Sequence, residues 1–330
     1  MPEKIILDTD MFGDYDDAGA LAVLHDYANR GMAEILATVS CTAGPRNRSV
    51  AVCEIINAFH GRADIPVGST KAPTAVGRET VGETKNSRYG YGVCEKYAHW
   101  VKHMEAEEAE DAVTVYRRVL AAAPDGSVTI VTIGFLTNLA GLLRSKGDEY
   151  SPLDGPALVR AKVKKWVAMA CAYPVGKECN SMWDPASSRI VLDEWPTPAI
   201  FTDFTYGRTV FTGRRLADSG LRDVPVVDIY RNCLVPVDQL TKNEQGEWSW
   251  DTPEGHPSWD HTAILIAVEG TEPFFGLERG RYAMVGDDGT NDWTPDPAGP
   301  HVRVTEKMPR AQIAERLEDA MLRSAGAYET

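Results

Sequence analysis

Cysteine is scarce in this 330-residue sequence, which contains six cysteines and no CxxC pair. So few cysteines in so long a chain argue against a disulfide scaffold and favour a reducing compartment. No apolar run approaches the roughly 20 residues that span a bilayer, and the opening MPEKIILDTD lacks the apolar core of a signal peptide. We therefore expect a cytoplasmic protein without a membrane segment.

Basic residues are fewer than acidic ones: the chain has 34 Lys and Arg and 48 Asp and Glu, which gives a net charge of −14. A surface this acidic repels phosphate backbones, so we expect no nucleic-acid polymer as a partner. The composition still leaves room for a small ligand, and an acidic excess suits carboxylates gathered around a metal ion. Apolar residues make up 43% of the chain, which excludes intrinsic disorder as its main character.

Strand and helix patterns alternate along most of the chain. Buried apolar runs such as VTIVTI, within Ser127–Ile133, are typical of a parallel sheet with both faces covered. No repeat or clear linker interrupts the alternation. The sequence predicts a single α/β domain over residues 1–330, with an open, mostly parallel sheet covered by helices on both faces. Ligands bind such sheets beyond the carboxyl ends of the strands.

One segment lacks any sustained period. Thr70–Val93 is rich in Gly, Thr and Tyr, and we predict a long loop there, as in a lid over a site. The wider segment Thr70–His103 carries aromatic residues that could wall a ligand pocket or pack locally. They are Tyr89, Tyr91, Tyr97, His99, Trp100 and His103.

Five carboxylates fall within ten residues in the run DTDMFGDYDD, between the first predicted strand and the helix that follows. Asp8 and Asp10 share a face of the strand, and Asp16 and Asp17 open the helix, where the dipole stabilises negative charge. A helix cap with solvated neighbours would need only one or two of them. A hard divalent cation would relieve the repulsion among all five.

Calcium suits this run best, because it takes about 6–8 oxygen ligands, including bidentate carboxylates and backbone carbonyls. Magnesium is an alternative that prefers fewer protein ligands. The run contains neither His nor Cys, which argues against zinc.

The sequence resembles the nucleoside hydrolases, the inosine–uridine-preferring nucleoside N-ribohydrolases. DTDMFGDYDDAGAL is similar to their opening DxDxGxDDAxAL, in a longer form that resembles a bacterial branch. Four later segments are similar to family motifs in the same order: INAFHGRADIPVG, VTIVTIGFLTNLA, PVGKECNSMWDPASS and SWDHTAI. The resemblance spans Ile5 to about Met308 and implies a Rossmann-related fold.

The resemblance also implies residue roles. Calcium would be held by Asp10, Asp17, the backbone carbonyl of Ile133 and Asp260, and Asp10 would act as general base on a calcium-bound water. The substrate would be bound by Asp16, Asn47, Glu178, Asn180 and Trp259. Asp8 would support the strand end, and Asp14, in a two-residue extension, has no implied role.

The chemistry of such a site follows from its residue types. Cleaving an N-ribosyl bond passes through an oxocarbenium-like sugar, which carboxylates and amides stabilise. A metal lowers the pKa of a bound water, and a carboxylate removes its proton.

The sequence departs from the family at the group that activates the leaving base. Some members have His immediately before the late metal-binding Asp, whereas this chain has Trp259, as in a purine-specific branch where Trp stacks on the base. His256 and His261 flank the site and are open alternatives as proton donors. Cys179 stands where the family often has an aromatic residue, and a catalytic Cys with a partnered His is a weaker alternative.

These observations predict calcium-dependent hydrolysis of ribonucleosides to base and ribose, with purines favoured. Two alternatives are a non-catalytic ribosyl- or nucleoside-binding protein, and a hydrolase of another N-ribosyl compound such as nicotinamide riboside. The resemblance further implies a homo-oligomer, either a dimer or a tetramer.

Overall fold

The computed structural model describes residues 1–11, 13–44, 46–72, 89–244, 246, 248 and 250–327. Within them the chain forms one 11-stranded sheet, in the order β4-β3-β2-β1-β5-β6-β8-β13-β11-β12-β7, and a two-stranded sheet of β9 and β10. Neighbours from β4 to β13 are parallel. The remaining pairs, from β13 through β11 and β12 to β7, are antiparallel.

The described strands have the following bounds: β1 (Glu3–Thr9), β2 (Ala33–Ser40), β3 (Val67–Ser69), β4 (Glu110–Asp111), β5 (Val128–Ile133), β6 (Val163–Met169), β7 (Val175–Gly176), β8 (Ala199–Thr202), β9 (Phe211–Gly213), β10 (Gly255–Pro257), β11 (Phe275–Met284), β12 (Asn291–Pro295) and β13 (His301–Glu306). The described α-helices are α1 (Asp16–Asn29), α2 (Ser49–Phe59), α3 (Tyr89–Lys96), α4 (Ala112–Ala122), α5 (Thr137–Arg144), α6 (Gly155–Lys162), α7 (Cys179–Met182), α8 (Pro185–Glu194), α9 (Phe204–Gly207), α10 (Arg214–Ala217), α11 (Pro225–Cys233), α12 (Trp259–Glu269) and α13 (Arg310–Ser324).

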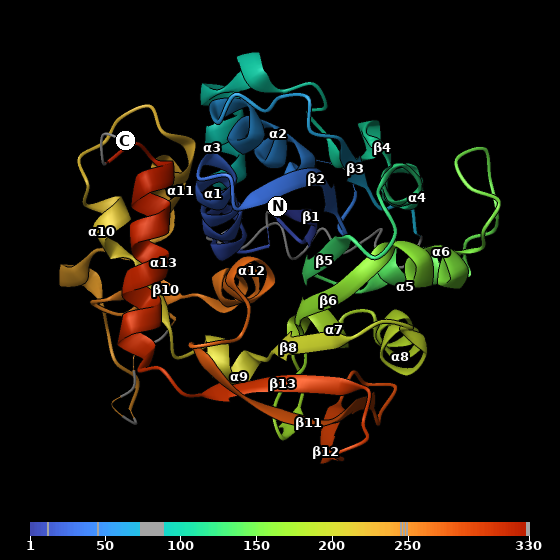
Figure 1. Ribbon diagram of the computed structural model, residues 1–330. Coiled ribbons are helices and arrows are strands. Elements are labelled where there is room, and N and C mark those ends of the chain that lie inside the picture. The colour runs from blue at the N-terminus through green and yellow to red at the C-terminus, as the bar shows by residue number, and fades with distance from the viewer. Residues whose placement is uncertain are drawn as a thin grey trace.

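Helices cover both faces of the sheet, as the buried parallel strands require. One apolar core joins α1, α2, α11, α12 and α13 to the sheet, and a second joins α4, α5, α6 and α8. Figure 1 shows the two groups on opposite sides of β1, β5 and β6. The predicted α/β class and the mostly parallel sheet are therefore confirmed.

The direction of strand addition reverses at β1. β2, β3 and β4 extend the sheet on one side of β1, whereas β5, β6 and β8 extend it on the other. The carboxyl ends of β1 and β5 thus flank the point where the strand order switches, which is where open α/β sheets bind ligands. Asp10 follows β1 directly, and Ile133 ends β5.

The predicted loop over Thr70–Val93 is wrong at its end, because α3 begins at Tyr89. Residues 73–88 of that prediction lie outside the described residues. The pattern was misleading because Gly90 and Gly92 disfavour a helix, whereas Tyr89, Val93 and Cys94 bury one side of it against the core.

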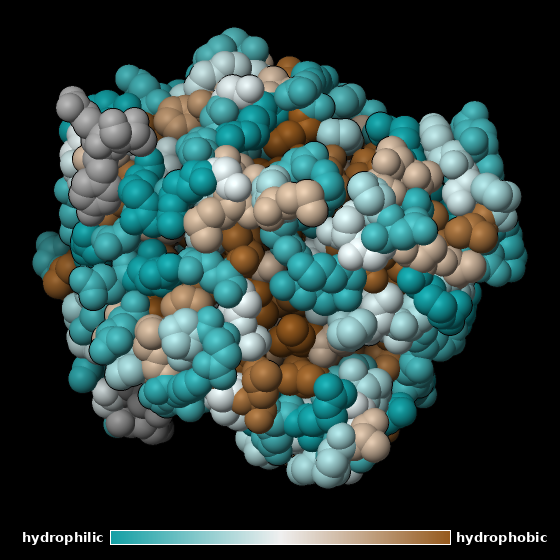
Figure 2. All heavy atoms as spheres, viewed as in Figure 1, coloured by the Kyte–Doolittle hydropathy of each residue, from teal (hydrophilic) through white to brown (hydrophobic). Residues whose placement is uncertain are grey.

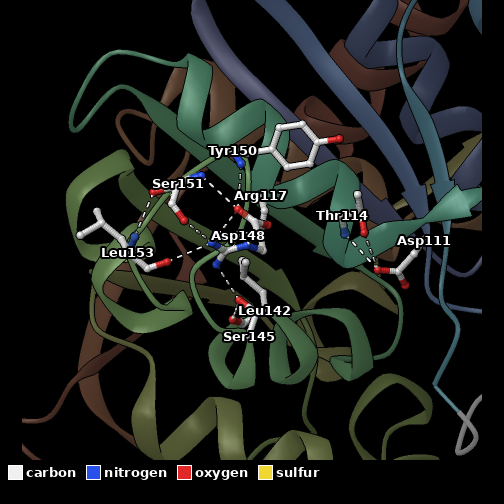
Figure 3. Close-up of polar contacts among 9 residues, drawn as sticks. All are labelled: Asp111, Thr114, Arg117, Leu142, Ser145, Asp148, Tyr150, Ser151 and Leu153. Carbon is white, nitrogen blue, oxygen red and sulfur yellow. Dashed lines mark hydrogen bonds and ion pairs between the residues drawn. The ribbon is translucent and has the colours of Figure 1, made fainter.

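An arginine at the middle of α4 anchors the segment between α5 and α6 (Figure 3). The Arg117 side chain is 3% exposed and forms a two-pronged ion pair with Asp148. It also donates to the hydroxyl of Ser145 at 2.9 Å and to the carbonyls of Ser151 and Leu153 at 3.0 and 2.9 Å. One guanidinium therefore forms hydrogen bonds with several polar groups of a turn that has few apolar contacts of its own.

Hydrophilic side chains dominate the face of the molecule in Figure 2, and apolar ones gather mainly near its centre. None of the helices in the described ranges combines the length and apolar character that crossing a bilayer requires.

Candidate active site

A cavity of about 470 Å³ opens at the carboxyl edge of the parallel strands. Its walls come from the loop after β1, the start of α1, the ends of β5 and β6, α7, α9, β10 and α12, and from the segment that carries Trp250. The described residues that line it are Asp10, Gly13, Asp14, Asp16, Asp17, Ile133, Met169, Glu178, Cys179, Asn180, Trp183, Phe204, Trp250, His256, Trp259 and Asp260. A cavity of this size holds a small organic ligand.

Carboxylates crowd one part of the cavity. Asp16, Asp17 and Asp260 are each at most 4% exposed, and each offers an oxygen within 4.8 Å of the others. Asp16 and Asp17 form the first turn of α1, and Asp260 lies in the first turn of α12. Two helix N-termini therefore point their positive ends at one cluster. The backbone N–H of Asp260 donates to Asp16 at 3.2 Å.

Burial and mutual repulsion disfavour the charged forms of these carboxylates. Burial, followed by repulsion from Asp17, Asp14 and Glu178, raises the pKa of Asp10 well above its ordinary value. Burial likewise raises the pKa of Asp17 to about 8, although Thr9 donates a hydrogen bond to it. Buried oxygen donors that repel one another fit a hard divalent cation, which would stabilise their charged forms.

The end of β5 approaches β1 so closely that only glycine fits after Ile133. A Cβ at Gly134 would lie 2.4 Å from the backbone nitrogen of Asp10 and 2.6 Å from the sulfur of Cys41. Ile133 itself lines the cavity beside Asp10. The structure therefore brings the four predicted metal-binding residues to one cavity.

Asp8 has a structural environment, as predicted. It is fully buried, and its carboxylate accepts hydrogen bonds from Tyr116 at 2.9 Å and Asn138 at 3.0 Å. Burial outweighs these bonds and raises its pKa to about 7. Asn138 also donates to the carbonyl of Ser40 at 3.1 Å. The asparagine of the GFLTN segment thus fastens the ends of β1 and β2 to α5.

Glu178 and Asn180 line the cavity from the start of α7. The Glu178 carboxylate accepts backbone N–H groups from Asn180, Ser181 and Cys171 at 2.7–3.1 Å, so its position is fixed by the helix cap. The amide nitrogen of Asn180 donates to the carbonyl of Met169 at 3.1 Å. Both side chains are held before any substrate arrives.

Asn47 is placed differently. Its amide nitrogen donates to Thr42 at 3.2 Å, and its amide oxygen accepts the backbone N–H of Ser49 at 2.9 Å, at the start of α2. The described residues that line the cavity do not include Asn47. Its role in substrate binding stays a prediction.

Aromatic side chains make up another wall of the cavity. Trp259 stacks on Phe204, with ring centroids 5.5 Å apart and planes at 17°, and donates its indole N–H to the Phe204 carbonyl at 3.1 Å. Trp250 contacts Trp259 edge-on at 5.6 Å and is 44% exposed. This wall can hold a flat, apolar ring.

Four further residues line the cavity but were not predicted from the sequence: Phe204, Trp250, Trp183 and Met169. Met169 and Phe204 had a detectable signal, because each follows or ends a strand whose carboxyl end faces the site. Trp250 had none, because it lies in a connecting segment far along the chain.

The aromatic residues of the predicted lid pack largely among themselves and against nearby helices. Tyr97 stacks on Trp100 and donates to Asp228, and His103 pairs with Glu54 at 2.7 Å. Tyr89 donates to the backbone carbonyl of Asp14 at 2.9 Å and so supports the loop after β1. That one of them contacts ligand stays a prediction.

The two flanking histidines have different surroundings. His256, in β10, lines the cavity, and its Nδ1 lies 2.7 Å from Asp251. His261 is fully buried, its Nε2 lies 3.1 Å from the hydroxyl of Tyr230, and burial lowers its pKa to about 3. The described cavity lining does not include His261.

Cys179 lines the cavity, but its chemistry does not suit a nucleophile. Burial, together with the charge of Glu178, raises the pKa of its thiol to about 12. The thiolate is the reactive form, and the raised pKa favours the protonated thiol at neutral pH. This disfavours the cysteine-based alternative.

Fold and cavity together define an α/β protein with a carboxylate-rich, aromatic-walled site at the switch point of its sheet. Residues 5–322 match the family described as "Inosine-uridine preferring nucleoside hydrolase". The chain belongs to this family, which places it among the nucleoside N-ribohydrolases. The family match confirms the resemblance seen in the sequence, whereas the bacterial branch stays a prediction.

Solved structures share the fold. A plant nucleoside hydrolase, PpNRh1, has a TM-score of 0.69 and 19% identity, over 97% of this chain and 99% of that one. The inosine-uridine preferring nucleoside hydrolase from Bacillus anthracis has a TM-score of 0.68 and 16% identity, over 99% and 100%. The type III effector XopQ, solved with adenosine diphosphate ribose, has a TM-score of 0.66 and 16% identity, over 99% and 93%. Curated protein sequences give no match.

Proposed function

We propose that this protein, as one domain over residues 1–330, hydrolyses ribonucleosides to free base and ribose, with calcium as its cation and purine nucleosides favoured. The observation that carries the proposal is the meeting of two chemistries in one cavity. Carboxylates of Asp10, Asp16, Asp17 and Asp260 gather beside an aromatic wall. The carboxylates suit a sugar and a cation, and the aromatic wall suits a base.

Calcium is proposed because the ligands are oxygens from carboxylates and a backbone carbonyl, without a soft ligand among them. Asp10, Asp17, Asp260 and the carbonyl of Ile133 would hold it. When bound, such a cation supplies a water of lowered pKa at the sugar.

The residues of the chain then have separate tasks. Asp10 removes the proton of the water that attacks the anomeric carbon. Asp16, Glu178 and Asn180 hold the ribose hydroxyls and stabilise the positive charge that grows on the ring. The expected role of Asn47 would require it to reach the sugar from outside the cavity lining.

Purine preference rests on Trp259, whose position in the aromatic wall supports contact with a base. A bicyclic base offers more stacking area than a pyrimidine. The expected homo-oligomer has no support beyond the family and stays a prediction.

The test is the release of base and ribose from inosine, guanosine, adenosine, uridine and cytidine. We expect equimolar base and ribose, with purines turned over faster. Asp10→Asn, which keeps the size of the side chain but not its basicity, should lower kcat by about 10³-fold or more and leave the thermal unfolding transition in place.

Nucleoside binding without ribose release would favour the non-catalytic alternative. Turnover of nicotinamide riboside alone would favour the other N-ribosyl substrate. Full activity of Asp10→Asn would contradict the assignment of the base.

A further inference from the structure

A histidine and an aspartate form a rigid pair at the wall of the cavity. His256 is 2% exposed, and its Nδ1 donates to the Asp251 carboxylate at 2.7 Å. Asp251 is itself held by the hydroxyl of Tyr15 and the backbone N–H of Val235, each at 2.8 Å. A carboxylate that accepts from Nδ1 fixes the orientation of the imidazole and supports its charged form.

The other ring nitrogen of His256 has no hydrogen-bond partner among the described residues. It lies 3.7 Å from Asp14, beyond hydrogen-bond distance but within reach of its charge. The ring is clamped between neighbours, because Tyr15 packs on it at 4.2 Å and Trp259 meets it edge-on at 5.8 Å. A buried polar atom without a partner, in a residue that lines a cavity, indicates a ligand contact.

The charges around His256 favour its protonated form. Burial alone would lower its pKa, but the carboxylates of Asp14 and Asp251 outweigh burial and raise the pKa to about 9. Asp16 is also close, because Asp14, Asp16 and His256 each offer an atom within 4.8 Å of the others. His261 on α12 adds no charge, since its lowered pKa keeps it neutral. The imidazolium therefore presents an N–H at Nε2 near neutral pH.

Hydrolysis of a nucleoside is accelerated by such an acid. A purine or pyrimidine is a poor leaving group as an anion and leaves more readily when a ring nitrogen is protonated. The carboxylates of the cavity serve the sugar and the cation. Cys179 is a weak acid. Trp259, which stands where some members of the family have His, has no acidic proton to give.

Resting on the proposed function, we propose that His256 donates the proton to the leaving base and that Asp251 is its positioning residue. As the C1′–N bond breaks, its electron pair stays on the base, which takes a proton from Nε2 of His256. The oxygen of water forms the new bond to C1′ and gives its proton to Asp10. Proton exchange with solvent then returns Asp10 and His256 to their starting states, so one water is consumed.

The test compares two substrates in His256→Asn. Asparagine can still donate to Asp251 from the position of Nδ1, but it has no group at the position of Nε2. Inosine needs a proton on its leaving group, whereas 4-nitrophenyl β-D-ribofuranoside releases a stable phenolate without one. We expect kcat/KM on inosine to fall by about 10²–10³-fold and kcat/KM on the nitrophenyl riboside to change by less than about 3-fold.

Asp251→Asn and a double variant separate positioning from a general structural role. Asp251→Asn should show the same selectivity with a smaller loss on inosine, and adding it to His256→Asn should cost little more, because the two residues act as a pair. The matched control is His60→Gln. His60 stacks on His25 and is not among the described residues that line the cavity, so kcat/KM on both substrates should stay unchanged.

Equal losses on both substrates would overturn the proposal and make His256 a structural residue. An unchanged rate on inosine would also overturn it and require another donor. Failure of the proposed function is distinct, because the unmodified protein would then hydrolyse neither substrate.

Discussion

At the residue scale, the site consists of carboxylates whose charged forms are disfavoured by burial in the fold. Asp16, Asp17 and Asp260 are buried together, and burial is the largest cause of their raised pKa values. The two helix N-termini that face the cluster offset part of this cost. Carboxylates with pKa values shifted in this way are typical of functional sites.

Trp259 gives the sharpest prediction at this scale. Trp259→Ala removes a ring that both lines the cavity and packs on Phe204. We expect kcat/KM to fall about 5-fold more for inosine than for uridine, because aromatic stacking contributes about 1 kcal/mol. Steady-state kinetics on both nucleosides checks this, with Trp259→Phe as a control that keeps an aromatic face. Equal losses on purine and pyrimidine would remove the stacking argument.

The sequence was informative about those site residues that lie close together in the chain or in recognisable motifs. The carboxylates after β1 could be predicted from charge density and spacing, whereas Asp260, in the first turn of α12, was implied by the resemblance to a family motif. The aromatic wall was only partly predictable. Trp259 lies in a family motif and Phe204 follows a strand end, whereas Trp250 meets Trp259 only through the tertiary fold. The pairing of His256 with Asp251 depends on the path of the chain into β10, which periodicity does not show.

At the element scale, polar side chains from helices fix the loops and strand ends around the site. Asn138 of α5 ties Asp8 to Ser40, and Thr137 donates to Asp184, the cap of α8, at 2.7 Å. These contacts of Asn138 and Thr137 explain motif residues that do not touch the cavity. Arg117 of α4 anchors the segment between α5 and α6, none of whose described residues lines the cavity (Figure 3).

Arg117→Met tests this anchoring. It removes three hydrogen bonds of a buried guanidinium and its ion pair with Asp148, whose side chain is 31% exposed, so the free energy of unfolding should fall by roughly 2–3 kcal/mol. The activity per folded molecule should not change, because Arg117 lies outside the described cavity lining. Denaturant unfolding measures the loss.

Arg118→Met is the matched control on the same helix. Arg118 pairs with Glu110, and both side chains are more than a third exposed, so the expected loss is below about 1 kcal/mol. Equal losses in the two variants would contradict an anchoring role for Arg117.

At the scale of the whole molecule, the sheet is partly predictable. Alternating strand and helix patterns predict that β1 to β6 and β8 are parallel, because each crossover helix returns the chain in the same direction. The antiparallel strands β11, β12 and β7 were not predicted, because their position beyond β13 depends on pairing between distant segments. Tertiary packing determines which strands pair there, and the local sequence pattern does not show it.

Neutral histidines join the helices on one side of the sheet. His25 of α1 stacks on His60 at 4.2 Å, and His60 lies 3.1 Å from the hydroxyl of Ser324 in α13. Burial, followed by the charge of Arg62, lowers the pKa of His60 from 6.5 to about 4. Burial lowers the pKa of His25 as well.

These shifts predict acid sensitivity. Below about pH 6.5 the unfolded chain takes up protons that the folded protein excludes, so stability is fully present above that pH and is lost as the pH falls toward 4. Between about pH 7 and pH 5, the Tm of His60→Gln should therefore fall less than the Tm of the unmodified protein. His99→Gln, at an exposed position, is the control and should not change the slope. An unaltered slope in His60→Gln would contradict the account.

The central claim is that one cation, held by the carboxylates beside β1, is required for ribonucleoside hydrolysis. The most direct measurement is a calcium titration of chelator-treated protein, with bound calcium and ribose release from inosine read on the same samples. We expect no release before calcium is added, and then a rise in step with bound calcium that saturates at one ion per chain. Full ribose release from protein that holds no metal would contradict the claim.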